Sequence, residues 1–172
     1  SGFTFNLAAT VGGTPINTSG TQSGTHYIMP NGINIVSLAN ASDAPIIQNF
    51  VFVSDISRFV FAFGCIDLGS AVQNPMLIRW SDQESVTNWT PAATNQAGSI
   101  RLSHGSEIIT CVQTRQEIVV FTDSALYSLQ YQGSPVVWSS QLLGDNISII
   151  GPNAAIAASG VIYWMGVDKF YK

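Results

Sequence analysis

The chain has 172 residues, of which 46% are hydrophobic, so it can bury a core as one domain and disorder is not expected. Charged residues make up only 9%, far below the roughly 25% of typical soluble domains. Because an isolated domain relies on charge for solubility, this composition indicates a surface largely covered by partner subunits. The net charge of −4 and the lack of a basic patch argue against a protein that grips nucleic-acid phosphates.

Short β-branched and aromatic runs recur between clusters of Gly, Asn, Asp, Ser and Pro, and helical periodicity is nearly absent. This pattern predicts antiparallel strands over residues 3–10, 33–38, 46–53, 59–63, 76–80, 99–102, 107–113, 118–122, 125–130, 136–142, 154–158 and 161–165. The segments 12–32 and 81–98 are long connections, which is typical of functional or contact-making loops.

A weak internal repeat relates EIVVFTDSALYSL (residues 117–129) to VIYWMGVDKFYK (residues 161–172), with Ile118 matching Ile162 at a spacing of 44. RFVFAFG followed by MLIRWSD is a looser third copy. Each copy is a strand, a turn and a second strand, preceded by a further strand. Repeats of about 40–50 residues made only of strands favour an all-β, antiparallel partial β-propeller of four-stranded blades, and a β-sandwich is the alternative.

The sequence divides into an N-terminal strand with a long, contact-making loop (residues 1–40) and propeller-like blades (residues 41–172). We expect the chain to be a fragment of a longer polypeptide, because it lacks an initial Met and stops inside an apolar run. The blades that it holds are too few to close most rings. A membrane segment is not expected, since no apolar run reaches the roughly 18 residues needed to cross a bilayer.

Motifs for catalysis, metal binding and cofactor binding are lacking. His26 and His104 stand alone, without a nucleophile or an acid at motif spacing, and neither metal-ligand clusters nor phosphate-binding glycine loops occur. Cys65 and Cys111 lie among apolar strand residues, which predicts free, buried thiols rather than a disulfide. We therefore expect no enzyme activity, no cofactor and no metal.

The stretch RWSDQESVTNWT (residues 79–90) concentrates charge and tryptophan in a chain that is poor in charge. We expect Asp82 to cap a turn, Arg79 to pair with it, and Trp80 and Trp89 to pin the loop to its blade. A sugar-cleaving site needs two facing carboxylates, and Asp82 with Glu84 is the one grouping of that kind beside aromatic residues. A glycan-binding or glycan-cleaving propeller is therefore the alternative.

Several short motifs occur together in one order: RWSD followed by W.P, AG and GS.I, then TD.ALY, Y.G.P and YWMG…FY. In this combination they resemble a family of tailed-bacteriophage virion proteins, the tail hub or nozzle proteins of the tail-tubular-protein-B type. The resemblance covers roughly residues 40–172. Its signature residues here are Arg79, Trp80, Ser81, Asp82, Trp89, Thr122, Asp123, Tyr127, Gly133, Trp164 and Gly166.

The resemblance implies a β-propeller subunit of the phage tail that forms part of the DNA-exit channel beneath the portal and adaptor. The implied partners are other copies of the chain in a ring and neighbouring tail and adaptor proteins, with DNA passing through without sequence-specific binding. Such a subunit assembles in the bacterial host cytoplasm and resides in the virion. A different virion surface protein, with no role in the channel, is a further alternative.

Overall fold

The computed structural model describes residues 10–11, 14–15 and 43–172, and the chain divides into two units, Ser1–Asn40 and Ala41–Lys172. In the first unit, β1 (Thr10–Val11) pairs in antiparallel fashion with β2 (Thr14–Pro15). The strands predicted over residues 3–10 and 33–38 lie, apart from Thr10, outside the described residues. So does most of the long segment 12–32.

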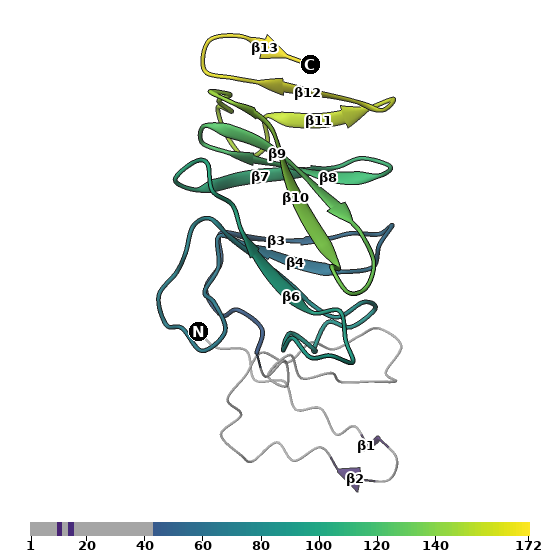
Figure 1. Cartoon of the computed structure of the whole chain (residues 1–172). Helices are drawn as coiled ribbons and strands as arrows, with labels where there is room; N and C mark the ends of the chain where they lie inside the picture. Colours follow the sequence, from purple (N-terminus) through teal and green to yellow (C-terminus); the bar gives the residue numbers. More distant parts are fainter. Residues whose placement is uncertain (1–9, 12–13, 16–42) are drawn as a thin grey trace. The chain divides into compact units, whose positions relative to one another are not determined.

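The second unit consists of three antiparallel sheets, and the described residues contain no helix (Figure 1). The predicted all-β class is thus confirmed. In each sheet the strands pair in the order in which they follow one another along the chain. The first sheet contains β3 (Phe50–Val53), β4 (Val60–Phe63), β5 (Leu77–Trp80) and β6 (Gly98–Arg101). The central sheet contains β7 (Ile108–Gln113), β8 (Glu117–Thr122), β9 (Ala125–Tyr131) and β10 (Trp138–Asp145). The third sheet contains β11 (Ala155–Ala158), β12 (Val161–Met165) and β13 (Phe170–Tyr171).

The internal repeat corresponds to the second and third strands of each sheet. The copy at residues 117–129 forms the β8–β9 hairpin, and the copy at residues 161–172 forms the β12–β13 hairpin. The looser copy supplies β4 and β5, which also pair with each other. Several predicted boundaries are off by one or two residues, and two are off by more. The strand expected from residue 46 begins only at Phe50, and β10 runs three residues past its expected end because a bulge between Leu142 and Gly144 lets it continue.

An aromatic core joins the first sheet to the central sheet. Phe61 and Trp80 of the first sheet pack against Ile118, Val120 and Trp138 of the central sheet. The rings of Phe61 and Trp138 meet edge to face, with centroids 5.0 Å apart. Such aromatic pairs add to the hydrophobic gain from the buried area, so this interface is the main core of the unit.

A second core joins the central sheet to the third sheet. Val119, Phe121 and Leu126 of the central sheet pack against Trp164 of β12. Successive residues of a strand point to opposite faces, and β8 is therefore apolar at consecutive positions because both of its faces are covered. The unit is a three-layered stack, one layer more than the two-sheet sandwich considered as an alternative.

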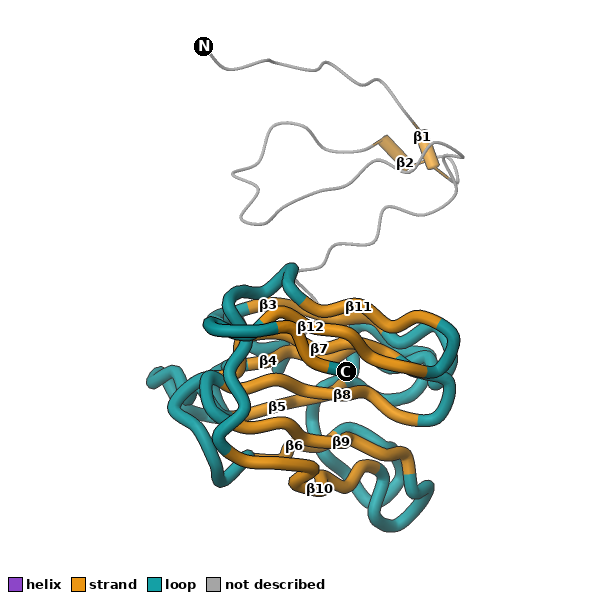
Figure 2. Tube along the Cα trace, turned by 90° about the horizontal axis from the view of Figure 1, so that it is seen from above, coloured by secondary structure: helices purple, strands orange, loops and turns teal. Residues whose placement is uncertain are grey.

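The sheets follow one another in chain order through the stack, and their first strands share one side of it (Figures 1 and 2). Figure 2 shows β3 and β11 at one side of the stack and β6 and β10 at the other. The first strands β7 and β11 lie side by side. Four-stranded meanders stacked in this way are typical of propeller blades. The sheets do not close on one another within residues 43–172, so closure into a propeller stays a prediction.

Candidate functional site

Arg79 is buried, with 3% of its surface exposed, on the face of β5 that points away from the aromatic core. Its guanidinium donates hydrogen bonds to the carbonyl oxygens of Asp43 at 2.8 Å, Trp89 at 3.3 Å and Ile66 at 3.4 Å. The expected pairing with Asp82 is wrong, because no ion pair joins these two described residues. Arg79 instead ties three backbone segments together from inside the protein.

Asp82 organises the loop between β5 and β6. Its Oδ1 accepts hydrogen bonds from the backbone N–H groups of Gln83 at 3.0 Å and Gln96 at 2.8 Å, and the expected turn-capping role is thereby confirmed. Glu84 lies at the surface, where its carboxylate forms an ion pair with Arg58 at 2.6 Å. The two carboxylates therefore have different partners, and neither is arranged as half of an acid–base pair.

The two tryptophans hold this loop at separate points. Trp80 belongs to the aromatic core, and its Nε1 donates to the carbonyl of Gln96 at 2.8 Å. Gly98 lies against the indole of Trp80, so closely that a Cβ there would come within 2.7 Å of Cζ2. Trp89 packs on the opposite face of the first sheet, and its Nε1 donates to the carbonyl of Val86 at 2.9 Å.

Ser81, between Arg79 and Asp82, is fully buried and links β4 to the start of the loop. Its Oγ accepts from the backbone N–H of Val60 at 3.1 Å and donates to the carbonyl of Asp82 at 3.0 Å. A buried serine with both hydrogen-bonding roles filled by backbone groups acts as part of the fold.

A second group of signature residues lies where β8 turns into β9. Thr122 Oγ1 accepts from the backbone N–H of Ala125 at 2.8 Å, and Asp123 accepts from the N–H and the hydroxyl of Ser106 at 2.7 and 2.6 Å. Slight burial raises the pKa of Asp123, but the hydrogen bonds from Ser106 and its neighbours outweigh this effect and hold the pKa below its ordinary value. Gly105 has a φ of +114°, and a Cβ there would lie 2.5 Å from Thr122 Oγ1.

Tyr127 connects the same turn to the segment before β7. Its side chain is buried, and its hydroxyl accepts from the backbone N–H of His104 at 2.7 Å. Ser103 Oγ lies 3.0 Å from His104 Nδ1 and 3.3 Å from the Tyr127 hydroxyl. Among the described residues no ion pair joins His104 to an acid, and these contacts fasten the turn.

The last signature residues also have local packing roles. Trp164 stacks on Tyr171 with ring centroids 5.1 Å apart, and a Cβ on Gly166 would lie 2.5 Å from Tyr171 Cε2. Gly133, in the turn between β9 and β10, has a φ of +74°, which an L side chain rarely adopts. The short motifs thus contact one another in pairs: RWSD meets AG, GS meets TD, and YWMG meets FY.

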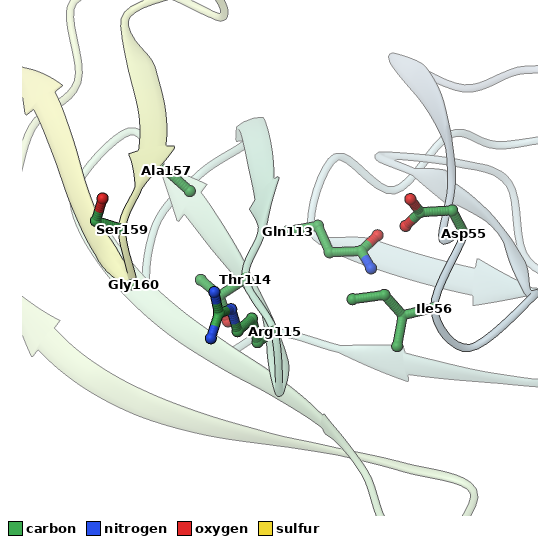
Figure 3. A pocket seen from close by; sticks show the side chains of 8 residues that line it. All are labelled: Asp55, Ile56, Gln113, Thr114, Arg115, Ala157, Ser159 and Gly160. Carbon is green, nitrogen blue, oxygen red and sulfur yellow. The ribbon is translucent and has the colours of Figure 1, made fainter.

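The turns at one end of the sheets enclose a shallow cavity of about 360 Å³. The first hairpin of each sheet contributes to it: Asp55 from the turn between β3 and β4, Gln113 at the end of β7 with Arg115 from the turn that follows, and Ser159 from the turn between β11 and β12 (Figure 3). Its lining contains no histidine or cysteine, and no nucleophile with a base beside it.

The outer face of the third sheet, which points away from the central sheet, is apolar, and no other sheet of residues 43–172 covers it. Its large side chains and their exposed fractions are Ile156 at 64%, Val161 at 38%, Tyr163 at 45%, Met165 at 38% and Phe170 at 81%. Sequence reasoning missed this feature. Along β12 the side chains on both faces of the strand are apolar. Those on one face pack on the central sheet, and those on the other face are exposed.

The remaining groups with possible chemical roles are the two cysteines and any cluster of metal-binding side chains. Cys65 and Cys111 are free, as predicted, but only Cys65 is buried and Cys111 is half-buried; desolvation raises their pKa values to about 11 and about 12. In the described part of the chain, no group of three or more His, Cys, Asp or Glu side chains is placed to hold a metal ion. The same residues include no helix able to cross a bilayer.

No protein-family model matches the chain, and no curated protein matches it in sequence.

Proposed function

We propose that this chain is a structural component of a tailed-bacteriophage virion, a tail hub or nozzle subunit that forms part of the channel through which DNA leaves. On this proposal its three sheets are blades of a β-propeller, and its role is architectural rather than enzymatic. The observation that carries the proposal is the stack of sequentially paired antiparallel sheets with their first strands on one side.

Two further features support this reading. The signature residues through which the chain resembles the tail family serve the fold, since each of them packs or hydrogen-bonds to another backbone segment or permits a turn. The composition is also that of a subunit largely enclosed by neighbours, with only 9% charged residues. An acidic balance of −4 would let DNA pass without adhering to the protein.

Localisation in the particle tests the proposal. Antibodies raised against the purified chain would be used for immunogold electron microscopy of particles of the phage that encodes it, alongside mass spectrometry of the same particles. We expect gold at the tail, at the end near the capsid. Absence of the chain from purified particles would refute a virion role, and gold spread over the capsid surface would favour the other virion surface protein.

The glycan alternative calls for a separate assay. A double variant, Asp82→Ala with Glu84→Ala, would be compared with the unaltered chain for hydrolysis of host-cell glycans and for incorporation into particles. The structural proposal predicts no hydrolysis by either protein. Hydrolysis by the unaltered chain that the double variant loses, with normal incorporation, would replace the structural proposal.

A further inference from the structure

The outer face of the third sheet is a continuous apolar surface. Ile156 pairs with Tyr163 across β11 and β12, and Met165 pairs with Phe170 across β12 and β13, so these side chains share one face with Val161. The rings of Phe170 and Tyr163 alone expose roughly 250 Å². The whole face exposes on the order of 500 Å², which is at the upper end for monomeric proteins and typical of an interaction site.

The internal repeat shows what such a face does elsewhere in this chain. At the spacing of 44 residues, Tyr163, Met165 and Phe170 correspond to Val119, Phe121 and Leu126 of the central sheet. Those three central-sheet residues are 2%, 1% and 9% exposed because the third sheet packs on them. The outer face of the third sheet therefore corresponds to the face of the central sheet on which the third sheet packs.

The opposite end of the stack offers a complementary surface. On β3, Phe50 and Phe52 point into the aromatic core, whereas Val51 and Val53 point away from it and are 52% and 62% exposed. Next to them, the loop that contains Trp89 packs on the same sheet. The uncovered apolar part of the first sheet is thus its first strand, β3.

The first strands of the central and third sheets, β7 and β11, lie side by side where these two sheets meet. A sheet added to the outer face would accordingly bring its own first strand to β11, where Ile156 projects. Within residues 43–172, β3 is the other first strand that, like β11, has one face without a neighbouring sheet. The two outermost sheets of residues 43–172 thus present the two halves of such a contact.

We propose that copies of this chain associate head to tail, with the outer face of the third sheet of one copy packed on the exposed face of β3 of the next. This inference rests on the proposed structural role, and it names the interface through which the subunits meet. A head-to-tail contact generates a ring when the rotation between copies closes and a filament when it does not. The contact is a continuation of the sheet stacking inside each chain.

Complementary variants test the contact, with association of the full chain measured by sedimentation velocity over a range of concentrations. Phe170→Asp places a charge on the outer face of the third sheet, and Val53→Asp places one on β3. Val72→Asp is the matched control, because Val72 is 76% exposed in the loop between β4 and β5 and lies on neither face. Near-UV circular dichroism of the buried tryptophans would verify that each variant is folded.

The unaltered chain and the control are expected to associate alike, and each of the other two variants to associate at least ~30-fold more weakly. An equimolar mixture of Phe170→Asp and Val53→Asp should form a one-to-one dimer, because each variant keeps the face that the other has lost. A monomeric unaltered chain, a Val53→Asp variant that associates normally, or a mixture that stays monomeric would each overturn the proposal.

Should either charged variant fail to fold, the cysteine variants Phe170→Cys and Val53→Cys combined in one chain provide a second test. Oxidation is expected to give a covalent ladder of head-to-tail copies, and the lack of a ladder would overturn the contact. The result also separates the two proposals: a monomer located in the tail refutes the interface alone, whereas an assembly of copies that is absent from particles refutes the virion role alone.

Discussion

Replacing Arg79 with alanine should lower the free energy of unfolding by about 3 kcal/mol, which is large for one residue of a domain this size. The short hydrogen bond from the charged guanidinium to the Asp43 carbonyl, at 2.8 Å, contributes the largest share, about 1.5–3 kcal/mol. The bonds to Trp89 and Ile66, at 3.3 and 3.4 Å, are longer and contribute about 0.5 kcal/mol each.

Lysine at the same position keeps the charge, but it does not reproduce the fork with which arginine reaches three acceptors, and we expect a loss of about 2 kcal/mol. Arg101→Ala is the matched control, since Arg101 lies on the neighbouring strand with its side chain exposed, and its replacement should change stability by less than about 0.5 kcal/mol. Urea denaturation followed by tryptophan fluorescence measures all three variants.

Hydrogen exchange adds a local measurement for the same variants. Because Arg79 ties the segment after β5 to the sheet, Arg79→Ala should raise exchange in residues 81–97 before it affects β8 and β9. An Arg79→Ala variant as stable as Arg101→Ala, with an unchanged exchange pattern, would refute the role assigned to Arg79.

Three further predictions concern single residues elsewhere in the second unit. Gly105→Ala should lower the free energy of unfolding by about 3 kcal/mol, because the φ of +114° and the 2.5 Å approach of a Cβ to Thr122 Oγ1 both oppose a side chain there. The control Gly151→Ala, where a Cβ would meet open space, should lower it by less than about 0.5 kcal/mol. Equal urea midpoints for the two variants would contradict this. The pKa of Asp123 is lower in the folded chain than its ordinary value of 3.8, so its carboxylate stabilises the fold above that pH and stops doing so as the pH falls through the folded pKa. The stability difference between the unaltered chain and Asp123→Asn should therefore be larger at pH 7 than at pH 3, and a difference independent of pH would refute this. The pKa values of Cys65 and Cys111 are raised to about 11 and about 12, so few of these thiols are ionised at pH 8. They should react with iodoacetamide at pH 8 at least ~100-fold more slowly in the folded chain than in urea. Fast labelling without denaturant would contradict this.

Strand positions could be predicted well from the sequence, because short apolar runs between turn residues are a local signal. The repeat also located the second and third strands of each sheet: the copies in the central and third sheets are 44 residues apart, and the looser copy supplies β4 and β5. Ring closure could not be predicted from such local patterns. It depends on contacts between the ends of the stack, which no local pattern encodes.

The detailed contacts of the signature residues were beyond sequence reasoning. Arg79 bonds to the carbonyl of Asp43, which is 36 positions away, and a carbonyl group carries no side-chain signal. The nearby Asp82 looked like the natural partner for the charge, but its carboxylate is already used by two backbone N–H groups. Likewise, no sequence pattern marks Phe170 as exposed, and only the stacking order of the sheets places it on an outer face.

The most direct test of the central claim is an electron cryo-microscopy map of the phage particle at a resolution that separates β-sheets. The account predicts density for residues 43–172 in the tail, repeated around its axis, with the third sheet of each copy packed on β3 of its neighbour. A map in which the tail contains no such stacked sheets, or in which copies leave Phe170 exposed to solvent, would contradict it.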